Sequence, residues 1–223
     1  QQVAEGATGV LLRACQYAPG AHLTPAEDGD IEVVGDTTDG ALLLLHRAWA
    51  SVLGQGVEVA HEWPFDSDRK MATVLLRADE GWESLTHGAA EVVLARCTSA
   101  MTPEGGMAAL DDEGRARLSA RIDAWAADGL RVLAVARRQS GLEGLSGALE
   151  QSKAPEQALT LIGLLGLSDP PRPEVGPALA SAAAAGVRTV MITGDHPSTA
   201  SAIGRELGLL REGGEVITGP QLE

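Results

Sequence analysis

A short segment near the C-terminus carries the side chains best suited to phosphate chemistry. An apolar, β-branched run at 187–192 leads into Thr193, Gly194 and Asp195, and a helix is expected at 198–207. Ligands collect where a buried parallel strand ends and turns into the next helix. The first N–H groups of that helix favour negative charge, and a glycine lets backbone amides approach an anion. The segment predicts a phosphate site; the alternative is an ordinary strand-to-helix loop.

The composition limits the possible partners of the 223 residues. Lysine and arginine total 17 against 31 acidic residues, a formal charge of -14 that repels nucleic acid and anionic lipid. Cys15 and Cys97 are the only cysteines, too few for a disulfide framework or a thiolate zinc site, and we expect both to be buried thiols. No apolar stretch is long enough to span a bilayer. Partners among nucleic acids and direct membrane contact are therefore not expected.

The elements that position these residues fall into two regions, separated by a glycine-rich seam at 140–155 with a boundary near Ala154. Residues 1–154 mix short strands with helices, which predicts an α+β unit with an antiparallel sheet and helices packed on it. Its clearest expected elements are strands at 57–65, 71–77 and 130–136 and a helix from Asp111 or Asp112 to Gly129.

Residues 155–223 show a different pattern. A strand at 159–167, a helix at 174–185 and a second strand at 187–192 predict a βαβ crossover with parallel strands. Such a unit needs further strands beside it to bury both faces. The second region is therefore expected to be a partial α/β, Rossmann-like unit, and the chain resembles an excised piece of a larger protein.

Six separated segments resemble, in order, motifs of the cytoplasmic part of cation-transporting P-type ATPases, relatives of the haloacid dehalogenase superfamily. The segments are GDTTDGAL at 35–42, FDSDRKM at 65–71, HGAAEVVL at 87–94, GLRVLA at 129–134, DPPR at 169–172 and TGDH at 193–196. The third segment resembles a family motif that begins Lys-Gly-Ala. The Phe65 segment and DPPR resemble the calcium-pump-like branch. The resemblance identifies residues 1–154 as a nucleotide-binding domain and 155–223 as part of a phosphorylation domain.

By this resemblance, three residues of the first region contact ATP directly. Phe65, the only phenylalanine, is expected to stack on adenine, a contact that contributes on the order of 1–3 kcal/mol. Lys70 is expected to meet phosphate or line the pocket, and Arg131 to reach phosphate with its planar fork. The structural alternatives are a core phenylalanine, a solvated strand lysine and a surface arginine.

Two departures from the family pattern fall in the expected adenine pocket. Asp39 stands where the family has glutamate beside the adenine amino group, and its side chain is one methylene shorter. His87 replaces the lysine that precedes Gly88 at the back of the pocket, where His87 and Gly88 are both expected to bind the nucleotide, so a fixed cation is lost. We expect weaker or more pH-dependent nucleotide binding.

In the second region, the resemblance places Thr193, Gly194 and Asp195 around the transferred phosphoryl group. Asp169 and Arg172, also expected among the nucleotide-binding residues, flank two prolines whose fixed φ suits a hinge; a proline turn before the helix at 174–185 is the alternative. The Asp-Lys-Thr-Gly-Thr segment that forms the family's aspartyl phosphate is not in this chain. The segment that supplies a Mg²⁺ ligand is also missing, so the ligands of Mg²⁺ are expected largely elsewhere and no metal site here.

The resemblance implies an ATP-binding piece of a pump that couples ATP hydrolysis to cation transport, at the cytoplasmic face of a membrane, with a bacterial plasma membrane expected. Its partners would be ATP and the remaining phosphorylation, actuator and transmembrane domains. The piece alone is expected to bind nucleotide without hydrolysing it efficiently, and the transported ion is not readable.

Two other classes stay open. A haloacid-dehalogenase-type phosphatase would share the Thr-Gly-Asp loop but would leave Phe65 and Arg131 unexplained. A stand-alone nucleotide-sensing module would keep the adenine pocket but would need neither the hinge nor that loop.

Overall fold

The computed structural model describes residues 6–26, 30–54, 56–78, 81–140, 154–168, 171–193, 197–210, 214–218 and 221. Contacts divide the chain into two compact units. The first unit holds Gln1–Ser119 and Leu133–Leu165, and the second holds Ala120–Val132 and Gly166–Glu223. Most of the seam expected at 140–155 lies outside the described residues.

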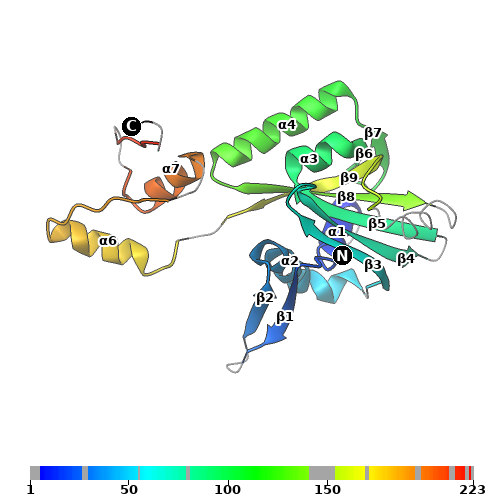
Figure 1. Ribbon diagram of the computed structural model, residues 1–223, viewed down its shortest axis with the longest axis horizontal. Coiled ribbons are helices and arrows are strands. Elements are labelled where there is room, and N and C mark those ends of the chain that lie inside the picture. Colours follow the sequence, from blue (N-terminus) through cyan, green and yellow to red (C-terminus); the bar gives the residue numbers. More distant parts are fainter. Residues whose placement is uncertain are drawn as a thin grey trace. The chain divides into compact units, whose positions relative to one another are not determined.

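A seven-stranded mixed sheet runs in the order β3-β4-β5-β8-β9-β6-β7 (Figure 1). The strands are β3 Val59–Asp66, β4 Met71–Ala78, β5 Gly81–Ala89, β6 Cys97–Met101, β7 Met107–Ala109, β8 Arg131–Ser140 and β9 Leu159–Leu167. The pairs β3–β4, β4–β5, β5–β8 and β6–β7 are antiparallel, whereas β6 and β9 run parallel. The α+β fold class expected from the sequence is thereby confirmed.

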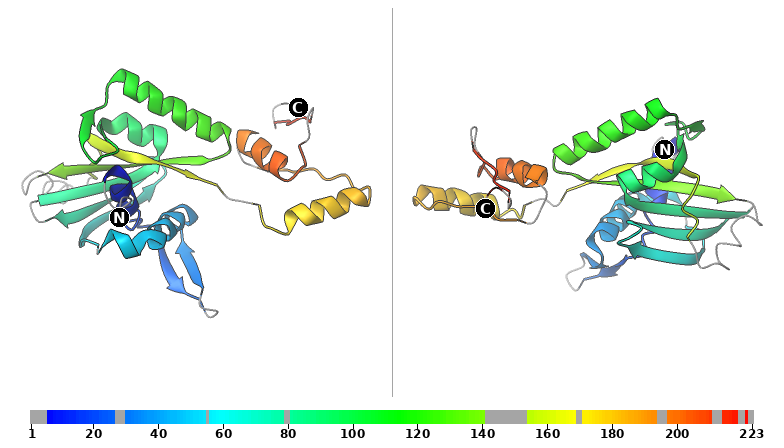
Figure 2. Two further views of the ribbon diagram at one scale, coloured as in Figure 1. Left: turned by 180° about the vertical axis from the view of Figure 1, so that it is seen from behind. Right: turned by 45° about the horizontal axis from the view of Figure 1, so that its top comes forward.

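Helices cover both faces of this sheet, with α1 and α2 on one face and α3 on the other (Figure 2). The helices are α1 Gly6–Ala14, α2 Thr37–Leu53, α3 Ala90–Arg96 and α4 Asp112–Ala127, and a separate antiparallel hairpin joins β1 Ala21–Pro25 to β2 Ile31–Gly35. Asp36 caps α2, because its Oδ1 accepts hydrogen bonds from the backbone N–H groups of Thr38 and Asp39 at 2.9 Å.

The period-2 alternation of the central strands separates the two faces. An apolar cluster joins one face to α1, in which Ala14 of the helix packs with these strand residues: Val74, Leu76, Leu85, Val135 and Ile162. The opposite face carries Leu75, packed with Trp63, and two buried threonines, Thr73 and Thr86, that are 3.0 Å apart at their hydroxyl oxygens. The α1 and α2 face is thus apolar at its centre, while the α3 face holds buried polar groups.

The strands expected at 57–65, 71–77 and 130–136 correspond to β3, β4 and β8, and the helix expected to end at Gly129 corresponds to α4. The apolar run at 159–167 also forms a strand, but β9 lies between β8 and β6 in the large sheet. Contacts of the described residues accordingly group the chain through Leu165 with the first unit. The functional boundary near Ala154 stays a prediction.

The second unit contains α6 Val175–Ala184 and α7 Pro197–Glu206, close to the two helices expected there. The prediction of a strand at 187–192 is wrong, because none of these residues belongs to a strand. Val190 and Ile192 are 73% and 93% exposed. A parallel strand forms only beside a hydrogen-bonding neighbour, and no strand of the described residues pairs with this run. In the described parts of the chain, no helix is both long and apolar enough to cross a bilayer.

Candidate nucleotide-binding site

The turn between β3 and β4 presents two of the predicted nucleotide residues. Phe65, at the end of β3, is 59% exposed, so it is not a core residue. The turn at 67–70 is held by Asp66, whose Oδ1 accepts from the N–H groups of Asp68 at 3.0 Å and Arg69 at 2.9 Å. Lys70 closes the turn with a φ of 55° and an exposed side chain. A left-handed lysine held by neighbouring bonds gives the turn one defined shape.

Gly88, near the end of β5, allows the β3–β4 turn to approach closely. The carbonyl of Lys70 accepts from the N–H of Ala89 at 3.0 Å. A Cβ at Gly88 would lie 2.3 Å from that carbonyl oxygen and 2.7 Å from the Cα of Met71, both of them backbone atoms. Only glycine fits here without a backbone shift. The register pairs Gly88 with Met71, which places the ends of β3 and β5 at one end of the sheet.

Asp39 and His87 form a buried pair beside this end of the sheet. Nε2 of His87 lies 2.8 Å from Oδ1 of Asp39, and Oδ2 of Asp39 accepts from the N–H of Gly20 at 2.7 Å. The two residues are 4% and 8% exposed, with Asp39 the more buried. A carboxylate only accepts, so Nε2 carries the proton of the shared hydrogen bond.

Burial raises the pKa of Asp39, but the hydrogen bond and charge of His87, together with the N–H of Gly20, outweigh it and hold this pKa below its usual value. The carboxylate is therefore ionised at neutral pH. Both of its oxygens already have a protein partner. The hydrogen bond that Asp39 would accept from the adenine amino group stays a prediction.

The remaining predicted site residues lie either in the second unit or outside the described residues. Arg131 is the exposed first residue of β8, Arg172 is exposed shortly before α6, and Thr193 is exposed. Gly194, Asp195 and Asp169 lie outside the described residues. The first unit thus brings together, at one end of the sheet, the following residues: Asp39, Phe65, Lys70, His87 and Gly88.

The sequence motifs did not predict a buried polar cluster around Glu156. Glu156 is 3% exposed, and its carboxylate accepts from the guanidinium groups of Arg69 and Arg96 and from the hydroxyl of Thr73. Glu156 directly follows Pro155 at the end of the seam and belongs to no motif. The FDSDRKM segment contains Arg69, but nothing in the sequence indicates its partner, because 87 residues separate them.

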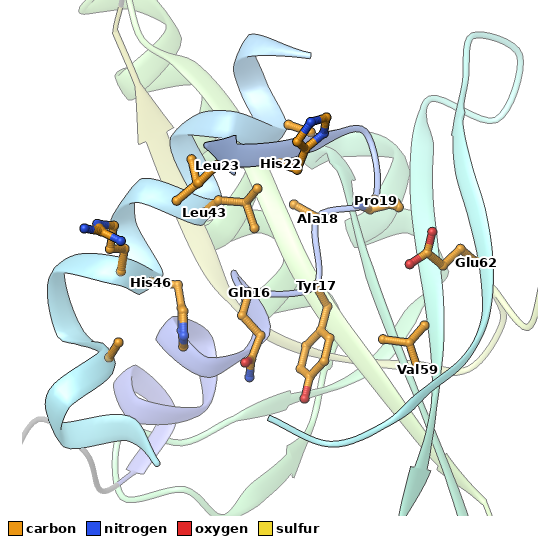
Figure 3. Close-up of a pocket in the computed structure, with 13 residues that line it drawn as sticks. Gln16, Tyr17, Ala18, Pro19, His22, Leu23, Leu43, His46, Val59 and Glu62 are labelled. Atoms are coloured by element: carbon orange, nitrogen blue, oxygen red, sulfur yellow. The ribbon is translucent and has the colours of Figure 1, made fainter. Parts of the chain in front are cut away.

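A groove of about 530 Å³ lies elsewhere on the first unit (Figure 3). Figure 3 shows Gln16 and Tyr17 from the segment after α1, Leu43 and His46 from α2, and Val59 and Glu62 from β3 around it. Tyr17 and His46 are engaged with backbone: the Tyr17 hydroxyl accepts from Val57 N–H at 2.6 Å, and His46 Nδ1 lies 3.0 Å from the Leu12 carbonyl oxygen. None of the predicted nucleotide residues lines this groove, so we place the candidate site at the sheet end, where the motif residues lie.

Metal and thiol chemistry find little support among the described residues. No three His, Cys, Asp or Glu side chains of the described ranges lie close enough to hold a metal ion. Cys15 and Cys97 are each 1% exposed, as expected for buried thiols. Burial raises the pKa of each thiol to about 12, with Arg115 opposing part of the effect at Cys97. Neither is a thiolate nucleophile near neutral pH.

Comparison with known proteins identifies the family. A calcium-transporting ATPase of Bacillus subtilis is 39% identical over 199 residues, which are 87% of this chain and 22% of that protein. Calcium-transporting ATPase 3, plasma membrane-type, of Oryza sativa is 34% identical over 97% of this chain and 21% of its own length. A calcium-transporting ATPase of Bacillus cereus is 36% identical over 85% of this chain and 21% of its own length.

The chain therefore spans about a fifth of the length of these relatives. Residues 8–174 match the family described as the P-type ATPase, cytoplasmic domain N. Because this match covers more than half of the sequence, the chain belongs to the P-type ATPase family, and most of it is the cytoplasmic domain N of that family.

Proposed function

We propose that this chain is the ATP-binding part of a cation-transporting P-type ATPase. The observation that carries the proposal is the turn between β3 and β4, which holds an exposed aromatic ring, Phe65, beside an exposed lysine, Lys70. An exposed ring offers a face for adenine, and a nearby cation suits phosphate. A phenylalanine that is 59% exposed gains little from folding, so a ligand contact explains its presence better than packing does.

The proposal extends to the remaining predicted residues. Asp39, His87 and Gly88 would form the back of the adenine pocket, and Arg131 would reach the phosphates. Thr193, Gly194 and Asp195 would serve the phosphoryl group, while Asp169 and Arg172 would form the hinge. Mg²⁺ would accompany ATP, with most of its ligands supplied from outside this chain.

The whole protein would couple ATP hydrolysis to cation transport, with phosphorylation, actuator and transmembrane domains as partners of this piece. The printed names of the relatives favour calcium as its cargo. The chain alone would bind ATP without efficient hydrolysis, because it does not contain the Asp-Lys-Thr-Gly-Thr segment.

Calorimetric or NMR titration with ATP, and separately with AMP, tests the proposal. We expect weak binding, near the millimolar level that corresponds to about 4 kcal/mol. Phe65→Ala should weaken ATP and AMP alike by about tenfold or more, because stacking on one base is worth roughly 1–3 kcal/mol.

Val59→Ala is the matched control, since Val59 is an exposed apolar residue at the other end of β3 and lines the groove. It should leave ATP affinity unchanged. Loss of binding in Val59→Ala but not in Phe65→Ala would move the ligand to the groove. A folded wild-type chain that ignores ATP would overturn the proposal.

A further inference from the structure

Glu156 is the most heavily bonded buried carboxylate among the described residues, and no motif of the family resemblance includes it. Its Oε2 accepts from Nη1 of Arg96 at 2.9 Å. Its Oε1 accepts from the hydroxyl of Thr73 at 2.8 Å and from Nη1 of Arg69. Three donors, two of them cationic, converge on one buried anion, which favours strong and directional bonds.

These partners belong to three separate elements. Arg69 lies in the β3–β4 turn, Thr73 in β4, and Arg96 is the last residue of α3. Glu156 itself comes shortly before β9, from a distant part of the chain. The carboxylate therefore connects the turn, the strand that follows it and a helix on the same face of the sheet.

Arg69 links the carboxylate of Glu156 to the end of β3, directly before the turn. Its Nη2 donates to the carbonyl of Pro64 at 2.8 Å, directly before Phe65, while its Nη1 reaches Glu156. Lys70 follows Arg69 in the chain and donates its own N–H to the carbonyl of Asp66 at 2.6 Å. The guanidinium of Arg69 thus ties the strand before Phe65 to the buried carboxylate, and Lys70 is attached to the same turn.

We propose that Glu156 is a positioning residue for nucleotide binding, which acts through Arg69 to fix the angle at which the β3–β4 turn presents Phe65 and Lys70. The proposal rests on the ATP-binding function proposed above. Glu156 makes no contact with the nucleotide itself. Its charge is required because a neutral acceptor would leave two partly buried guanidinium groups, 29% and 28% exposed at their side chains, with a weaker partner.

Glu156→Gln is the primary test, because it keeps the shape of the side chain and removes its charge. In the folded 223-residue chain we expect the Kd for ATP to rise about tenfold, the size of coupling common within one hydrogen-bond network. Arg69→Lys, which keeps the charge but loses the fork, should weaken ATP by a similar factor. The double variant should lose little more than either single variant, because both changes break one connection.

Stability must be separated from positioning. Leu76→Ala, which removes buried contacts on the opposite, α1 face of the sheet and at the far end of β4 from the turn, serves as a destabilised control whose ATP affinity should stay at the wild-type value. In ligand-free spectra, Glu156→Gln should shift the amide resonances of Phe65 and Lys70, whereas Leu76→Ala should not.

The outcomes distinguish this inference from the proposed function. If the wild-type chain binds no ATP, the function itself fails. If the wild type binds ATP and folded Glu156→Gln binds it equally well, with unchanged Phe65 and Lys70 resonances, Glu156 is a structural residue only and the inference is wrong. If Glu156→Gln does not fold, Arg69→Lys decides alone by the same two measurements.

Discussion

Gly88 has a structural role that its sequence motif does not reveal. The HGAAEVVL segment places Gly88 next to the expected adenine pocket, and the resemblance assigns it to nucleotide binding. In the fold, its missing side chain makes room for the carbonyl of Lys70, which bonds to Ala89. Gly88 therefore shapes the site by bringing the β3–β4 turn against β5, whatever contact it makes with a ligand.

The buried pair of Asp39 and His87 predicts a pH dependence at the residue scale. The pKa of Asp39 is lowered from 3.8 in the folded chain. A depressed carboxyl pKa contributes stability that is fully present above the unfolded value and is lost as the pH falls through the folded value. The free energy of unfolding of wild type relative to Asp39→Asn should therefore decrease as the pH falls from about 5 through the folded pKa of Asp39.

Carboxyl chemical shifts, followed by NMR from pH 7 downward over the range in which the native spectrum persists, give the Asp39 pKa directly. The expected result is a midpoint below 3.8. A midpoint above 3.8 would mean that desolvation outweighs the bonds from His87 and Gly20, and that the pair in solution differs from the one described.

At the scale of elements, the C-terminus of α3 depends on a side chain from α4. Nη1 of Arg115 donates to the carbonyl of Leu94 at 2.5 Å, and Nη2 donates to the carbonyl of Cys97 at 2.8 Å. The Leu94 carbonyl also accepts from the backbone N–H of Cys97, so the guanidinium adds a second, charged donor at this helix end. This cap fixes α3, whose final residue, Arg96, bonds to Glu156.

Arg115→Met should lower the free energy of unfolding by about 1–3 kcal/mol, because two partly buried carbonyls lose a charged donor while the aliphatic packing is kept. Arg117→Met, two positions along the same helix, is the matched control: its ion pair with Glu113 is exposed, at 68% and 82% of the two side chains, and should contribute close to nothing. Urea unfolding of both variants measures the difference. Equal losses would show that the cap adds no stability beyond that of a surface ion pair.

The sequence predicted which segments form strands better than it predicted which strands pair with one another. The apolar runs at 71–77 and 159–167 indicated strands correctly, because period and β-branching are local properties. The position of β9 between β8 and β6 depends on which distant strands offer a hydrogen-bonding edge, and no local pattern records that choice. The same reasoning explains why the expected strand at 187–192 is wrong despite its strong apolar run.

For the molecule as a whole, motifs predicted which residues belong to the candidate site but not what holds them. Phe65 and Lys70 were predicted from the FDSDRKM segment, and both side chains are exposed at one end of the sheet. Glu156 could not be found, since an isolated glutamate in a seam has no sequence signature. Its role arises only when β9 brings the preceding segment beside β4 and α3.

The two units differ in how deeply their isoleucine side chains are buried, and this difference predicts the effect of substitutions on stability. Ile162 in β9 is 5% exposed in the core of the first unit, whereas Ile192 in the second unit is 93% exposed. Ile162→Ala should lower the free energy of unfolding by about 2–5 kcal/mol through lost burial and a cavity. Ile192→Ala should change it by less than about 0.5 kcal/mol, because it removes no buried contact.

Denaturant unfolding, with amide hydrogen exchange of residues 188–192 as a local probe, compares the two isoleucine variants in the same chain. Fast exchange at 188–192 and a neutral Ile192→Ala would agree with an apolar run that has no strand beside it. A loss in Ile192→Ala as large as in Ile162→Ala, with slow exchange, would mean that the run finds a buried partner in solution and that the strand expected from its sequence forms after all.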